Sequence, residues 1–119
     1  MNHPVIPEQL QIDAALSGRL WNLVQRFCGG AWGELPAIWT VSFEQIVQEA
    51  KRRDLNAFVV IQPRGEGYWL LETDAGYVVF YAERGARMYH EEFKDLEPAF
   101  RHWLDQELRL HLLPGQSSA

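Results

Sequence analysis

The chain is short of the residues and segments that mark several large classes of protein. It has a single cysteine, Cys28, in 119 residues, so no disulfide can form within the chain. Such cysteine usage is typical of a reducing compartment. No apolar run approaches the roughly 20 residues that cross a bilayer, and residues 1–11 lack the apolar core of a secretory signal. We therefore expect a cytoplasmic protein that does not enter a membrane.

Positive charge is also scarce. Eleven Lys and Arg residues stand against sixteen Asp and Glu, which gives a formal net charge of −5 at pH 7. Nucleic-acid binders hold phosphates with clustered Lys and Arg, and the pair Arg52–Arg53 is too short for such a patch. We expect no nucleic-acid partner. The acidic balance fits a basic protein partner, because complementary fields speed encounter, but many cytoplasmic proteins are mildly acidic without one.

Signatures of catalysis and of metal binding are absent from the sequence. His102 and His111 are nine residues apart, so a helix would place them on opposite sides, about 180° apart. His90 and Glu92 have no evident third ligand. The glycines of residues 65–67 lie between two expected strands, whereas a dinucleotide fingerprint joins a strand to a helix. We expect no metal, no cofactor and no enzymatic activity.

Length and composition fit one globular domain. The hydrophobic fraction is 47% and the charged fraction 23%, both ordinary for a folded chain of this size. We expect a single domain over residues 1–119. Within it, residues 1–7 should form an extended N-terminal arm and residues 114–119 a flexible tail.

Apolar residues at helical spacing predict three helices, over residues 8–28, 43–53 and 95–113. Gly18 interrupts the first pattern. Ser42 and Gln45 have the spacing of a capping box at the start of the second helix. Asp95 is a good N-cap for the third.

Four β-rich segments lie between the last two helices, over residues 57–62, 68–73, 77–82 and 86–93. Short turns separate them, which forces consecutive strands to pair antiparallel. The expected order is α-α-β-β-β-β-α. The fold class is therefore α+β, with an antiparallel β-meander packed against helices.

The meander contains all four tyrosines of the chain and does not alternate cleanly between apolar and polar residues. If Ala75–Gly76 formed a two-residue loop, Leu70 would pair with Tyr81. One face would then carry Tyr68, Leu70, Tyr77, Val79 and Tyr81, and the other Trp69, Leu71, Val78 and Phe80. A longer loop would change this register. Either helices cover both faces, or one face presents tyrosine and aliphatic side chains to a partner.

Acidic residues gather where the last strand meets the last helix: Glu91, Glu92, Asp95 and Glu97. Their ordinary role is helix capping and solvation. Their alternative role is contact with basic groups of a partner. The residues that we predict to bind a partner are Tyr68, Tyr81, Glu91, Glu92 and Asp95.

Residues 77–104 carry a strand, an ERG turn, a second strand and a helix. The residues that form this pattern are Val79, Tyr81, Glu83, Arg84, Gly85, Phe93, Ala99 and Leu104. The segment resembles the C-terminal half of small immunity proteins from bacterial polymorphic-toxin systems, which include contact-dependent and type VI-delivered toxins. It covers about a quarter of the chain.

The resemblance implies a protein that is not an enzyme. Immunity proteins bind a cognate toxin domain, often a nuclease, and block it in the cytoplasm of the producing cell. An acidic immunity protein would fit a basic nuclease. The alternative is a small regulatory or adaptor domain that binds a host protein or a ligand, in which case the sheet could serve as the interface of a homodimer.

Overall fold

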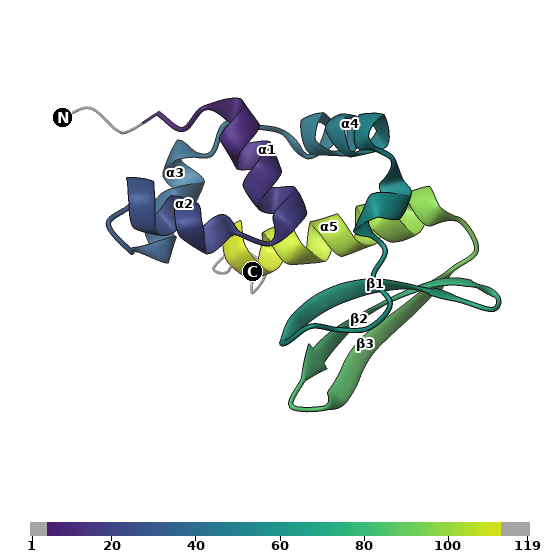
Figure 1. Cartoon of the computed structure of the whole chain (residues 1–119). Coiled ribbons are helices and arrows are strands. Elements are labelled where there is room, and N and C mark those ends of the chain that lie inside the picture. Colours follow the sequence, from purple (N-terminus) through teal and green to yellow (C-terminus); the bar gives the residue numbers. More distant parts are fainter. Residues whose placement is uncertain (1–4, 113–119) are drawn as a thin grey trace. The chain divides into compact units, whose positions relative to one another are not determined.

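The structure is a computed structural model that describes residues 5–112 (Figure 1). The described residues form helices and one antiparallel three-stranded sheet, so the α+β class is confirmed. Residues 1–4 of the expected arm and the expected tail, residues 114–119, lie outside the described residues. Of the rest of the arm, Val5 is exposed whereas Ile6 is 2% exposed and packs into a core.

The described chain divides into two compact units. One contains the residues up to Glu49 and those from Leu108 onward, and the other contains Ala50–Glu107. We describe each unit by itself. The expectation of a single domain stays a prediction.

Two helices, α1 (Glu8–Ser17) and α2 (Leu20–Phe27), stand where the sequence predicted one continuous helix. That prediction was wrong because Gly18 adopts a left-handed conformation, with φ of 73°. The N–H groups of Gly18 and Arg19 both donate to the carbonyl oxygen of Ala14, which ends α1. Glycine meets the left-handed requirement of a helix end without steric cost.

The first unit has its own hydrophobic core, to which the short elements η1 (Trp32–Glu34) and α3 (Leu35–Ile38) contribute. Its buried members are Ile6, Ala14, Leu20, Leu23, Val24, Cys28, Leu35, Ile38 and Leu112. Burial and the nearby Glu34 carboxylate raise the pKa of the Cys28 thiol. Cys28 is therefore a packed side chain rather than an activated nucleophile.

Gln11 is fully buried in the first unit and makes four hydrogen bonds. Its Nε2 donates to the carbonyl oxygen of Ile6 and to Oγ1 of Thr40, each at 2.8 Å. Its Oε1 accepts from the backbone N–H groups of Thr40 and Val41. A buried amide is tolerated only when its polar atoms are satisfied, and here the amide ties α1 to the segment before the next helix.

The helix α4 (Phe43–Arg53) begins and ends as predicted. The capping box is present, because the N–H of Ser42 donates to Oε1 of Gln45 and the N–H of Gln45 donates to Oγ of Ser42. Two N–H groups that the helix cannot satisfy internally are thereby paired.

The sheet of the second unit has the order β1-β2-β3. Its strands are β1 (Gly67–Thr73), β2 (Gly76–Glu83) and β3 (Ala86–Phe93). The predicted first strand, residues 57–62, was wrong: a 3₁₀ helix, η2 (Leu55–Phe58), overlaps its start. The described meander therefore has three strands.

Local hydrogen bonding explains the missing strand. The carboxylate of Asp54, at φ of 84°, accepts from the N–H of Asn56 and turns the chain into η2. Such side-chain bonds compete with strand formation. Only Val60 pairs with the sheet, in an isolated parallel bridge to Leu71, and Ile61 is 95% exposed. The β-branched run is thus a connection along the edge of β1.

The faces of the sheet are those predicted, although the pairing differs. Tyr81 pairs with Tyr68 rather than with Leu70, because the loop is Asp74–Ala75 and not Ala75–Gly76. The pairing shifts by two positions, and since the side-chain period of a strand is two, each side chain keeps its face.

The pairing of β2 with β3 contains a bulge. Its register shifts between Val79 and Tyr81, so Tyr89 and His90 both lie opposite Phe80. Tyr89 has φ of 58°. A bulge of this kind adds one residue to one strand and re-aims the side chains around it.

Glu83 pairs with Ala86, so Arg84–Gly85 is a two-residue hairpin loop. Both loop residues have positive φ, 50° and 83°, as a type I′ turn requires. Gly85 adopts this conformation without steric cost. Arg84 shares it, although a residue with a side chain adopts it less readily.

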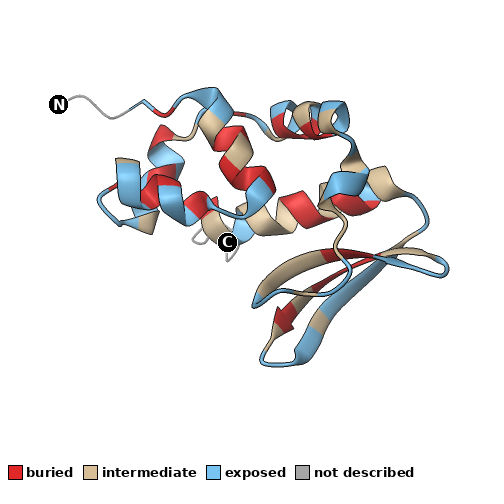
Figure 2. Ribbon diagram, in the orientation of Figure 1, coloured by how far each residue is buried: buried red, intermediate tan, exposed pale blue. Residues whose placement is uncertain are grey.

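The last helix, α5 (Leu96–Leu112), begins one residue after Asp95. Within the second unit it buries Phe100 and Leu104 completely, and the Phe100 ring meets that of Phe58 with centroids 5.4 Å apart. Along α5 the buried residues recur every three to four positions, as in an amphipathic helix (Figure 2).

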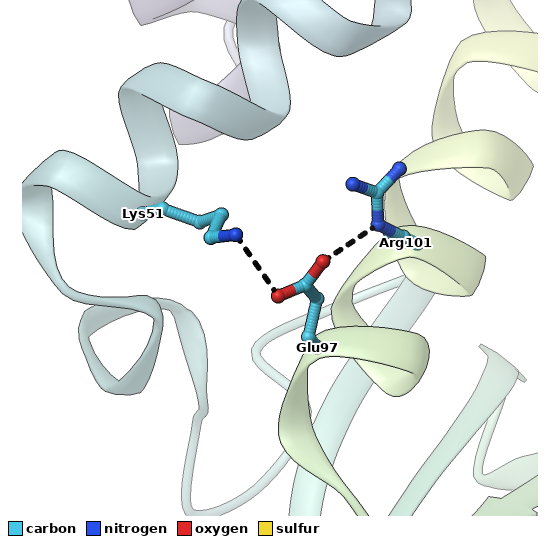
Figure 3. A network of polar contacts seen from close by, with 3 residues as sticks. All are labelled: Lys51, Glu97 and Arg101. Carbon is cyan, nitrogen blue, oxygen red and sulfur yellow. Dashed lines mark hydrogen bonds and ion pairs between the residues drawn. The ribbon is translucent and has the colours of Figure 1, made fainter.

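Glu97 joins the end of α4 to the first turn of α5 (Figure 3). Its Oε1 lies 3.2 Å from Nζ of Lys51, and its Oε2 accepts from Nε of Arg101 at 3.1 Å. These contacts lower the pKa of the Glu97 carboxyl: the hydrogen bond from Lys51 is the largest cause, the bond from Arg101 follows, and burial opposes them.

Candidate protein-binding site

The backbone of Tyr68, near the start of β1, is held by α5. Its N–H donates to Oε1 of Glu107 at 3.2 Å, and its carbonyl oxygen accepts from Nε1 of Trp103 at 3.0 Å. The Tyr68 ring meets that of Tyr81 edge to face, with centroids 5.0 Å apart. Edge-to-face packing is a preferred geometry for aromatic rings. This pair is the fixed half of the candidate site.

Tyr89 supplies the exposed half. Its side chain is 71% exposed, an unusual value for a large aromatic residue. It comes from β3, which has no fully buried residue and is drawn mostly in pale blue in Figure 2. Strained left-handed conformations of non-glycine residues are concentrated at functional sites, which makes this tyrosine the most distinctive residue of the surface. We call Tyr68, Tyr81 and Tyr89 the tyrosine cluster.

Electrostatic effects connect the three tyrosines. Burial is the largest cause that raises the pKa of Tyr68, followed by the nearby hydroxyls of Tyr89 and Tyr81 and by the Glu107 carboxylate. The pKa of Tyr81 is also raised, first by burial and then by Glu83 and other carboxylates. Both hydroxyls thus stay protonated at physiological pH, where each can donate or accept a hydrogen bond.

A shallow hollow of about 320 Å³ adjoins the cluster. Its lining residues come from β1, β3 and α5, and they are Tyr68, Tyr89, His90, Glu91, His102 and Gln106. The ring of His102 is held by packing against Phe93, with centroids 5.4 Å apart, whereas the ring of His90 lies against Phe80 on the opposite face of the sheet, at 5.3 Å. The hollow is therefore walled by rigid elements rather than by a loop.

The predicted partner-binding residues do not all lie at this surface. Tyr68, Tyr81 and Glu91 are at the cluster or its hollow. Glu92 is exposed but pairs with Val78, on the other face of the sheet. Asp95 is exposed in the bend before α5. The predicted set is thus distributed over two faces and a turn.

Four residues of the surface were absent from the predicted set: Tyr89, His90, His102 and Gln106. Tyr89 was visible as one of four tyrosines, but the strand pattern carries no sign of the bulge that places it beside Tyr68. His102 and Gln106 are four apart on α5, so they share a helix face. Their common position could have been predicted from that spacing.

A second hollow, of about 490 Å³, surrounds the Arg84–Gly85 turn. It is lined by residues of that turn and of residues 62–66, with both acidic and basic side chains, so it has no single charge preference. Beside it, the guanidinium of Arg87 lies 4.6 Å from the centroid of the Phe80 ring. This stacking covers the edge of the core on the face opposite the tyrosine cluster.

Comparison with known proteins assigns no family to the chain. No family model matches it, and no curated protein or solved structure was found to be similar. The resemblance of residues 77–104 to immunity proteins therefore stays a prediction.

Two further features can be stated of residues 5–112. No group of three His, Cys, Asp or Glu side chains among them could hold a metal ion. None of the helices in this range combines the length and the apolar character that crossing a bilayer demands.

Proposed function

We propose that this chain is an immunity protein, which binds a cognate toxin domain in the cytoplasm and neutralises it through the tyrosine cluster. The observation that carries the proposal is the exposure of Tyr89 beside the Tyr68–Tyr81 pair. Exposed tyrosines on a rigid support are typical of protein interfaces, because the ring adds contact area and the hydroxyl a hydrogen bond at low entropic cost.

The charge of the chain supports a basic partner. The formal net charge is −5, and Glu91 lies at the hollow beside the cluster. Complementary fields accelerate association and disfavour wrong partners. A basic nuclease domain is the kind of toxin that fits this charge and the resemblance of residues 77–104.

The test is to identify the protein encoded beside this chain and to co-express the two. We expect rescue of growth and a one-to-one complex on gel filtration. Replacing Tyr89 with Ala should weaken the complex by at least about 2 kcal/mol if it is a hot spot. Continued toxicity and the absence of a complex would overturn the proposal.

A control variant separates binding from folding. Ile61 is even more exposed than Tyr89 but is not part of the hollow or the cluster, so Ile61→Ala should leave the affinity unchanged. Equal losses of affinity for Tyr89→Ala and Ile61→Ala would show that the partner binds elsewhere.

A further inference from the structure

The hollow beside the tyrosine cluster has the chemistry of a receptor for one basic side chain. We propose that it receives a single arginine of the partner, with the guanidinium against Tyr89 and paired with Glu91. This inference rests on the proposed function for the identity of the partner, but the site can be tested without it.

The size of the hollow fits one long side chain. Its volume of about 320 Å³ is at the lower end of the roughly 300–1,000 Å³ of small-molecule sites. It is shallow and open to solvent at Tyr89, so a side chain can enter from a neighbouring protein surface. Its base is rigid, because α5 holds Tyr68 through Glu107 and Trp103.

The lining offers the groups that a guanidinium uses. Arginine stacks on an aromatic face and forms two parallel hydrogen bonds to a carboxylate, and here Tyr89 provides the face and Glu91 the carboxylate. The side-chain amide of Gln106 can accept a further N–H. Lysine has no planar group to stack, so it should bind more weakly in the same place.

Charge also favours a cation. Among the six lining residues Glu91 is the only Asp, Glu, Lys or Arg. Further carboxylates lie nearby: Glu107 accepts the N–H of Tyr68, and Glu66 and Glu83 act on the hydroxyl of Tyr81. An anionic group would meet repulsion from these carboxylates. A metal ion is disfavoured because the described residues form no ligand group for one.

The first experiment uses the isolated protein and two probes, N-acetyl-arginine methylamide and its neutral isostere N-acetyl-citrulline methylamide. Both are titrated into ¹⁵N-labelled protein and followed by amide NMR shifts. We expect the arginine probe to saturate with a dissociation constant of about 1–10 mM, near −4 kcal/mol or weaker, with shifts centred on Tyr89, Glu91 and Gln106. Equal binding of citrulline, or shifts centred elsewhere, would overturn the inference.

The second experiment compares two neighbouring carboxylates. Glu91→Gln removes the charge at the hollow, while Glu92→Gln removes one on the opposite face of the same strand. We expect Glu91→Gln to weaken the arginine probe about tenfold and Glu92→Gln to leave it unchanged. If both variants weakened the arginine probe equally, the probe would be bound by the overall negative charge and not by this site, which would contradict the inference.

The same variants separate this inference from the proposed function. If the arginine probe binds but the neighbouring toxin does not, the site stands and the immunity function fails. If the toxin complex forms and is unaffected by Glu91→Gln and by saturating arginine probe, the immunity function stands and the arginine site fails.

Discussion

The indole N–H of Trp103 donates to the backbone carbonyl oxygen of Tyr68 at 3.0 Å. A side chain of α5 therefore satisfies a polar group of β1 that the sheet leaves unpaired. Together with the bond from the Tyr68 N–H to Glu107, this contact fixes the strand on which the tyrosine cluster is built. The rigidity of the cluster thus depends on the helix that follows the sheet.

Replacing Trp103 with Phe tests this anchoring. The variant keeps an aromatic ring but leaves the Tyr68 carbonyl oxygen without its donor, so we expect a loss of about 2 kcal/mol in the free energy of unfolding. Urea unfolding measures it. Trp69→Phe is the matched control, because its Nε1 donates to Gly65 in an exposed setting; a loss there as large as at Trp103 would contradict the assignment.

Among the glycines that the structure describes, Gly76 has the least room for a side chain. A Cβ there would lie 2.2 Å from the carbonyl oxygen of Phe93, at φ of 148°. We expect Gly76→Ala to cost about 3 kcal/mol, at the upper end of ordinary substitutions. A Cβ at Gly85 would have no atom within 4 Å. Gly85→Ala should therefore lower the free energy of unfolding by only about 1–2 kcal/mol, because of the positive φ alone. Thermal melting of both variants distinguishes a clash from backbone strain.

Acid should weaken the contacts of Glu97. Its pKa is lower in the folded protein than in the unfolded chain, so its contribution is present above the ordinary carboxyl pKa and is lost as the pH falls through the folded value. We expect Glu97→Gln to be less stable than the natural protein near pH 7, and we expect the difference to shrink as the pH falls below the ordinary carboxyl pKa and to vanish once Glu97 is protonated in the folded protein. Because the ion pair with Lys51 is exposed to solvent, the difference should also shrink in high salt. A stability difference between the two proteins that does not change with pH would contradict this prediction.

Tyr89 should oppose stability while it supports binding. A non-glycine residue in the left-handed region costs about 1–2 kcal/mol, and glycine relieves this at an entropic cost of about 0.5–1 kcal/mol. Tyr89→Gly should therefore melt at the same or a higher temperature, yet bind the partner at least about thirtyfold more weakly. Arg84 also has a positive φ, in the hairpin turn. Arg84→Gly should therefore melt at the same or a higher temperature as well, but without loss of affinity for the partner. A fall of several degrees for Tyr89→Gly alone would show that its packing outweighs the strain.

Local signals in the sequence predicted the parts of the fold that local interactions decide. The bounds of α4 follow from the Ser42–Gln45 capping box and the apolar stripe behind it. The faces of the sheet follow from the side-chain period of two along a strand. The predicted loop at Ala75–Gly76 was wrong, but the faces were still right because the pairing differed by an even number of residues.

Features decided by competing interactions could not be predicted in this way. The run that begins at Ala57 has strand composition, but the hydrogen bond from Asn56 to Asp54 starts η2. The bulge at Tyr89 arises in the pairing of β3 with β2, which a short window of sequence does not show. The candidate site was therefore predicted at Tyr68, Tyr81 and Glu91 but not at its most exposed member.

The bulge has a consequence for the protein at high concentration. An open strand edge can add strands from other molecules and seed fibrous aggregates. The outer edge of β1 is occupied by Trp103, Glu107 and Val60, so among the described residues β3 is the edge left open. There the bulge at Tyr89 interrupts the regular pairing of the strand. The residue with the most exposed aromatic ring of the cluster thus also denies other copies of the chain a regular edge along which an intermolecular sheet could grow.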